Sequence, residues 1–195
     1  MTLLTFMAHP DDAELWAGGT IARHVHEGGT ATIAVPKHDP IRTAEAATGA
    51  QTLGAGLYLL DDLTPTTVST LLTDVRPDVV ITHSTDDIHA EHLLAALPDV
   101  VIATGRPARV YHCDGYNNLD QHGEPLALPT IIDVTEHWST KIAALQAHMS
   151  QPILDHFGPM AETLSRLHGM RIGTFRAEAF RPLAVLGRVP AALAL

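Results

Sequence analysis

Apolar runs of strand length alternate with amphipathic segments of helix length over the first half of the chain. The runs are short and rich in Leu, Ile and Val, and each ends at a turn or a polar loop. The predicted strands are Leu3–Met7, Thr30–Val35, Leu57–Leu60 and Asp78–His83, and the predicted helices are Glu14–Glu27, Arg42–Leu53 and Thr66–Val75. This alternation predicts an α/β fold with a parallel sheet and helices on both faces.

The second half has a less regular pattern. The expected elements are a helix from His89 towards Gly105, interrupted or kinked at Pro98, a strand Val110–Cys113, a strand Thr130–Val134 and a helix Thr135–Met149. The loop 114–129, rich in Gly, Asn, Asp and Pro, is too long for a simple connector and is a candidate substrate loop. No repeat or linker divides the chain, so we expect a single domain over residues 1–195.

Composition and net charge argue against some classes of function and partner. With 195 residues, of which 46% are hydrophobic and 17% charged, the chain is typical of a globular protein with one core. The net charge of −10 disfavours nucleic acids and anionic membranes as partners. No apolar window approaches the roughly 18 residues of a spanning helix, and no signal-like segment opens the chain. We therefore expect a cytoplasmic protein without a membrane partner.

A histidine and two adjacent carboxylates follow the first strand directly. His9, Asp11 and Asp12 lie in the segment Ala8–Glu14, at the edge where open α/β sheets bind ligands. Adjacent side chains on a non-helical backbone point in different directions. One carboxylate could therefore bind a metal beside His9 while the other acts as a base, as metal-assisted hydrolysis requires. Taken alone, the segment could also be a turn with an aspartate capping the next helix.

A second cluster follows the strand Asp78–His83. If a helix opens near His89, then His89 and His92 lie three residues apart and share one face. Both histidines could bind a metal, or one could bind it while the other contacts a substrate. Two imidazoles and one carboxylate would leave positions open for water, which is typical of a catalytic zinc site.

At these two places the chain resembles the PIG-L/LmbE-like family of zinc-dependent N-deacetylases, with their A-H-P-D-D-E-like and H-x-D-H-like motifs. The resemblance implies a Rossmann-like three-layer sandwich with a mostly parallel sheet. It also implies that His9, Asp12 and His92 bind one Zn²⁺ per chain, or another divalent transition metal. Asp11 would then be the general base, and His89 would polarise or protonate the reacting amide.

The resemblance extends along nearly the whole chain. It includes Ile41–Glu45, Asp61–Asp62, Lys141–Gln151 and Ala177–Arg181. It implies that Arg42 and Asp62 are substrate-binding residues, and His38 is a further candidate because its loop lies on the ligand-binding edge. Arg42 could instead pair with Glu45 within one helix turn. Lys141 and His148 are expected to be architectural.

Three features depart from the family pattern. Glu91 stands where an aspartate is more usual and should still orient a neighbouring histidine. Asp87 stands where some relatives have a tyrosine. The chain is also short, so loops around a large substrate are trimmed or come from a neighbouring subunit, which leaves a homo-oligomer open.

The sequence thus predicts a hydrolase that removes the acetyl group from a small N-acetylated amino sugar or glycoside. Two alternatives remain: a metal-dependent hydrolase of another small amide, and a non-catalytic sugar-binding α/β module. Gly18–Gly19 lacks the spacing of a nucleotide-binding loop and is expected to serve helix–sheet packing.

Overall fold

A single mixed sheet forms the centre of the protein. The computed structural model describes residues 1–96 and 109–189, and in these ranges seven strands form one sheet in the order β3-β2-β1-β4-β5-β7-β6. They are β1 Thr2–Phe6, β2 Thr30–Pro36, β3 Gly56–Leu60, β4 Val79–Thr82, β5 Arg109–His112, β6 Thr130–Asp133 and β7 Ala177–Pro182. Strands β1 to β5 run parallel, whereas β7 is antiparallel to both β5 and β6. The predicted mostly parallel α/β sheet is confirmed.

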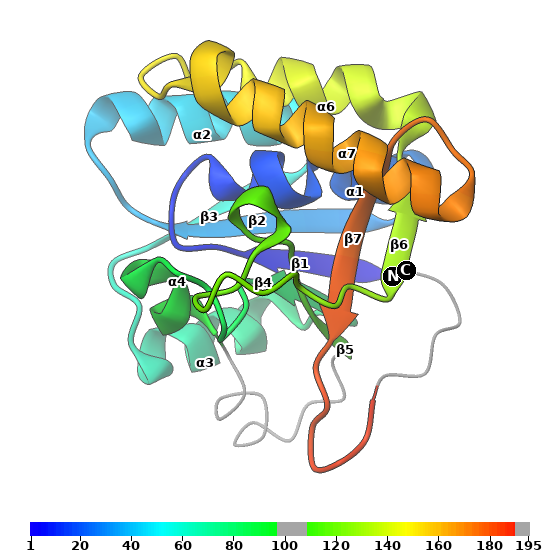
Figure 1. The fold of residues 1–195 in the computed structure, drawn as a ribbon. Coiled ribbons are helices and arrows are strands. Elements are labelled where there is room, and N and C mark those ends of the chain that lie inside the picture. Colours follow the sequence, from blue (N-terminus) through cyan, green and yellow to red (C-terminus); the bar gives the residue numbers. More distant parts are fainter. Residues whose placement is uncertain (97–108, 190–195) are drawn as a thin grey trace.

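Helices cover both faces of this sheet (Figure 1). They are α1 Asp12–His26, α2 Pro40–Leu53, α3 Pro65–Val75, α4 Ala90–Ala95, α6 Trp138–Leu145 and α7 Gly158–Ile172. The helices α1, α2, α6 and α7 lie on one face and α3 and α4 on the other, which gives three layers. Among the described helices, none is both long enough and apolar enough to cross a bilayer.

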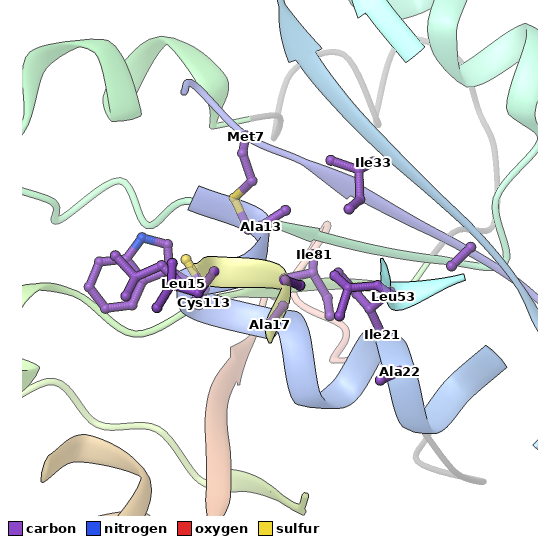
Figure 2. Close-up of a cluster of buried hydrophobic side chains, with 14 of the residues drawn as sticks. Met7, Ala13, Leu15, Ala17, Ile21, Ala22, Ile33, Leu53, Ile81 and Cys113 are labelled. Carbon is purple, nitrogen blue, oxygen red and sulfur yellow. The ribbon is translucent and has the colours of Figure 1, made fainter. Parts of the chain in front are cut away.

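Two apolar clusters join the layers. Alternate strand residues point to opposite faces, so Leu3 lies in the cluster under α1 and Leu4 in the cluster above α3. Figure 2 shows part of the first cluster, to which Ile33 of β2, Ile81 of β4 and Ile21 of α1 all belong. All four residues of β4 are buried, as expected for a strand covered on both faces.

The start of α2 is fixed by its own sequence. The side chain of Asp39 accepts hydrogen bonds from the backbone N–H groups of Ile41 and Arg42, and Pro40 occupies the first turn. Gly54 ends the helix with a φ of 73°, a conformation that glycine adopts without strain. These signals hold Arg42 in the first turn of α2.

Several elements differ from the sequence prediction. The helix expected from His89 towards Gly105 ends at Ala95, and its expected kink at Pro98 lies outside the described residues. The helix expected over Thr135–Met149 starts with a 3₁₀ turn and is α-helical only from Trp138 to Leu145. The elements α7 and β7 were not predicted. The strand β7 carries the buried acid Glu178, which interrupts its apolar pattern.

The two central strands β1 and β4 lead to opposite faces. The connection after β1 enters α1 on one face, and the connection after β4 enters α4 on the other. Chains that diverge in this way open a crevice at the carboxyl ends of the strands, where open α/β sheets bind ligands.

Candidate metal centre and active site

Three candidate metal-binding atoms lie close together at this edge of the sheet. His9 Nδ1 lies 3.1 Å from Asp12 Oδ2 and 3.2 Å from His92 Nε2, and the last two atoms lie 3.5 Å apart. Ligand atoms about 2.0–2.2 Å from a tetrahedral zinc ion are separated by about 3.3 Å. The three separations therefore match one face of a coordination tetrahedron, and the residues fit a divalent metal ion.

Two further carboxylates orient the two imidazoles. Asp87 Oδ2 accepts a hydrogen bond of 2.9 Å from His92 Nδ1, and Glu91 Oε2 accepts one of 2.5 Å from His9 Nε2. Because these nitrogens donate outwards, the other nitrogen of each ring presents its lone pair towards Asp12. Metal-binding histidines are oriented in this way by carboxylates. Two lone pairs and a carboxylate that face one another repel unless a proton or a cation lies between them.

The electrostatics of the site favour a positive charge. Burial lowers the pKa of His9, but hydrogen bonds and attraction from Asp12 and Glu91 outweigh burial and raise this pKa to about 9. Burial would also raise the pKa of Asp12, but the charge and hydrogen bond of His83, followed by His9, hold it well below its usual range. Asp12 therefore stays ionised in a buried position, which suits a metal ligand.

His83 contacts Asp12 in the interior. Its ring stacks on that of His92 with 3.8 Å between centroids, and its Nε2 lies 3.1 Å from Asp12 Oδ2 and 3.2 Å from the backbone nitrogen of Ala8. The structure thus contains two overlapping groups that could hold a metal ion: Asp12, His83 and His92, all buried, and His9, His89 and His92, which lie nearer the surface. Both groups include His92.

Asp11 lies beside the three converging atoms without being one of them. It occupies the N-cap position of α1, but its side chain makes no capping hydrogen bond. Its Oδ1 instead accepts a hydrogen bond of 2.8 Å from Arg42 Nη2. Burial and then the charge of Asp12 raise the pKa of Asp11, and Arg42 opposes this shift. The adjacent aspartates therefore have different surroundings, as the sequence predicted, and the helix-cap alternative does not describe Asp11.

His89 lies at the exposed side of the site. It is the N-cap residue of α4, and its ring centroid lies 4.9 Å from that of His9 and 4.6 Å from that of His92. This position is compatible with both roles that the sequence left open, metal binding and substrate contact.

The predicted substrate-binding residues have different positions. His38 Nε2 lies 3.2 Å from Arg42 Nη1, so His38, Arg42 and Asp11 form a chain of contacts. Asp62 accepts hydrogen bonds from Thr64 and Thr67 at the start of α3 and contacts none of the other predicted site residues in the described ranges.

The alternative pair between Arg42 and Glu45 is not formed. Glu45 accepts hydrogen bonds of 2.8 Å and 2.6 Å from the backbone nitrogen and the hydroxyl of Ser150. Arg42 is therefore free to hold Asp11.

Two residues that lie beside His92 were not predicted from the sequence to contact it. Asp87 follows a buried strand and precedes a histidine by five residues, and only the path of the loop brings it to His92 Nδ1. Tyr116 comes from the loop 114–129, and its ring lies nearly parallel to that of His92, with 6.1 Å between centroids and 15° between planes. The length of the loop 114–129 was the one feature of the sequence that suggested a contact between this loop and the site.

The fold and site define an α/β protein with a cluster of His and Asp side chains that could hold a divalent metal, at the switch point of its sheet. Similar solved structures include a conserved protein from Thermus thermophilus, with 22% identity, a TM-score of 0.78 and coverage of 99% of this chain and 98% of that one. They also include N,N'-diacetylchitobiose deacetylase from Pyrococcus horikoshii, with 19% identity, a TM-score of 0.74 and coverage of 93% and 83%. A third is 4-carboxy-2-hydroxymuconate hydratase from Pseudomonas putida, with 21% identity, a TM-score of 0.76 and coverage of 99% and 99%.

The sequence matches no protein-family model. At these identities the likeness establishes the fold, and the fold carries proteins named for two different reactions. The function must therefore be argued from the residues of the site.

Proposed function

We propose that this protein is a zinc-dependent N-deacetylase that hydrolyses the acetamide of a small N-acetylated amino sugar or glycoside to the free amine and acetate. The main observation is that the ligand atoms of His9, Asp12 and His92 lie 3.1–3.5 Å from one another, whereas the carboxylate of the adjacent Asp11 is held by Arg42. The resemblance to PIG-L/LmbE-like deacetylases and the fold shared with a chitobiose deacetylase support the substrate class.

Each of the site residues has its own proposed role in the hydrolysis. His9, Asp12 and His92 would hold the metal ion, which when bound supplies the Lewis acidity that makes water more nucleophilic and the amide carbonyl more electrophilic. Asp11 accepts the proton of the attacking water, and its raised pKa makes it a stronger base than an ordinary aspartate. Arg42 holds Asp11 in place. His89, at the exposed side, stabilises the negative charge on the amide oxygen, and Asp11 or His89 returns a proton to the leaving amine.

Other features of the proposal rest on the sequence. Three features remain predictions from the sequence. They are a single domain over residues 1–195, a cytoplasmic location, and a small-molecule substrate without nucleic-acid or membrane partners. A homo-oligomer also stays open. Zinc is the proposed metal because two imidazoles and one carboxylate are typical ligands of catalytic zinc.

The test is acetate release from a panel of N-acetylated sugars and their glycosides by the zinc-loaded protein. Asp11→Asn should keep its zinc and lose activity about 100- to 10,000-fold, because the base is removed and the ligands remain. Asp74→Asn, an exposed aspartate on α3, is the matched control and should retain full activity. Absence of acetate release from every member of the panel would overturn the proposal.

Hydration is a second candidate, because the hydratase from Pseudomonas putida shares the fold over 99% of both chains. Adding water to a carbon–carbon double bond would use the same centre and the same base. Loss of the ultraviolet absorbance of an unsaturated carboxylic acid, without acetate release from acetylated sugars, would favour this reaction.

A further inference from the structure

Tyr116 is a half-buried aromatic residue that the proposed mechanism does not use. It lies in the 3₁₀ turn Tyr116–Asn118 after β5. Its ring packs edge-on against Trp16, with 5.4 Å between centroids, and at a tilt against Phe157, with 6.4 Å between centroids. The ring of His92 lies nearly parallel to it. Packing on three sides fixes the ring of Tyr116 beside the metal centre.

The hydroxyl of Tyr116 has no hydrogen-bond partner among residues 1–96 and 109–189. An ordinary phenol is protonated at neutral pH, so the Tyr116 hydroxyl is a hydrogen-bond donor. The hydroxyl oxygen is not among the fully buried polar atoms that lack a partner, so it is open to solvent and can donate to a bound ligand.

The turn that carries Tyr116 is firmly held. Asp114 Oδ1 accepts hydrogen bonds from the backbone nitrogen of Gly115 at 2.8 Å and from the side-chain amide of Asn118 at 2.9 Å. Asp114 Oδ2 accepts one of 2.7 Å from His168 Nε2 on α7. These four residues are buried, so the turn is tied to the body of the protein.

The backbone of this turn is also unusual. Asn117 and Asn118 have φ values of 56° and 59°, in the left-handed region that asparagine tolerates better than most residues. Strained backbone persists where its surroundings hold it, and such positions cluster at ligand sites. The strain, the buried Asp114 contacts and the unpaired hydroxyl together indicate a preorganised donor.

We propose that Tyr116 is a substrate-contacting residue whose hydroxyl donates a hydrogen bond to an oxygen of the substrate bound beside His92. This inference deepens the proposed function and rests on it for the nature of the substrate. An acetamide carbonyl and a sugar hydroxyl both offer such an oxygen. The ring of Tyr116, together with Phe157, would form an apolar wall beside the same substrate.

The test measures the binding of a probe and the turnover of a substrate separately. Acetohydroxamate, a small metal-binding analogue of an acetamide, is titrated calorimetrically into the zinc-loaded wild type and into Tyr116→Phe, which keeps the ring and removes the hydroxyl. The expected result is unchanged zinc content, probe affinity about tenfold weaker, and kcat/KM for the best acetylated substrate about tenfold lower. Tyr58→Phe is the matched control, because the Tyr58 hydroxyl pairs with Asp74 away from the site, and it should behave as the wild type.

Equal probe affinity in Tyr116→Phe and the wild type would overturn the inference, as would a probe that does not bind the wild type. Failure of the proposed function gives a different result. In that case the wild type releases no acetate, while the probe still binds more weakly to Tyr116→Phe than to the wild type.

Discussion

Arg42 donates a hydrogen bond of 2.8 Å from Nη2 to Oδ1 of Asp11. Both side chains are largely shielded from solvent, with exposed fractions of 15% and 7%. The contact turns the carboxylate of Asp11 towards α2, whereas the carboxylate of Asp12 faces the two imidazoles. Arg42 thereby separates the proposed base from the proposed metal ligands, although the two aspartates are adjacent in the chain.

Replacing Arg42 should move the acidic limb of the pH–rate profile to higher pH. Arg42 lowers the pKa of Asp11, and the base must be deprotonated to act, so the variant Arg42→Gln raises the pH at which the active form appears. Activity should therefore fall more at pH 6 than at pH 8. The measurement is kcat/KM against pH, with zinc content determined at each pH.

Arg23→Gln is the control, because Arg23 pairs with Glu27 on the exposed side of α1. Its profile should overlay that of the wild type. An acidic limb that stays in place in Arg42→Gln would show that Asp11 does not set it.

The proximity of His9, Asp12 and His92 can be predicted from the sequence because these residues follow strand ends. His9 and Asp12 come directly after β1, and His92 lies ten residues beyond the end of β4 at Thr82. Since β1 and β4 are neighbours in the sheet, a correct strand order is enough to bring these residues to one edge.

Other parts of the site depend on contacts that local patterns do not encode. Asp87 reaches His92 through the path of a loop, and Tyr116 reaches it through a turn anchored on α7 by His168. The strand β7 is inserted between β5 and β6, and its buried Glu178 is paired with Lys141 on α6 and with backbone N–H groups of α1, all distant in sequence. Pairings over such sequence distances cannot be derived from hydrophobic periodicity.

Loss of the Asp87 carboxylate should weaken metal binding without removing a ligand. The variant Asp87→Asn no longer offers His92 Nδ1 a charged acceptor, so the ring is less well oriented and its Nε2 less basic. We expect zinc affinity to fall about 10- to 100-fold in competition with a chromophoric chelator. The neighbouring Asp86→Asn, which loses a contact with Arg181, should keep the wild-type affinity. Equal affinities of the two variants would contradict the orienting role.

The buried ion pair between Lys141 and Glu178 should contribute strongly to stability. Lys141 Nζ donates to Glu178 Oε1 at 2.5 Å and to the backbone oxygen of Leu15 at 2.7 Å, and both charged side chains are almost fully buried. Lys141→Met leaves Glu178 buried without its counter-ion, which should lower the free energy of unfolding by about 3–5 kcal/mol.

Urea unfolding at neutral pH measures this effect. The exposed pair between Arg166 and Glu162 gives the control, since Arg166→Met should change stability by less than about 1 kcal/mol. Similar losses in the two variants would mean that burial does not strengthen the Lys141 contact.

His112 should make the protein less stable as the pH falls from about 6.5 to about 4. Its side chain is 2% exposed, and neither ring nitrogen has a hydrogen-bond partner in the described part of the chain. Burial, followed by the positive charge of Arg181, lowers the pKa of His112 to about 4. In the unfolded chain the pKa returns to about 6.5, so between these values the unfolded state binds a proton that the folded state does not. Stability therefore falls with falling pH in this window, by roughly 3 kcal/mol in total.

The variant His112→Leu removes the titrating ring and keeps a similar volume. Compared with the wild type, it should lose roughly 2–3 kcal/mol less stability between pH 7 and pH 4.5, as measured by urea unfolding in the presence of a chelator. The chelator removes metal binding, whose own pH dependence would otherwise contribute. The exposed His122, replaced by leucine, is the control and should lose as much stability as the wild type. If His112→Leu also loses as much as the wild type, the acid sensitivity of the fold lies in other groups, such as His83, whose pKa is also lowered by burial.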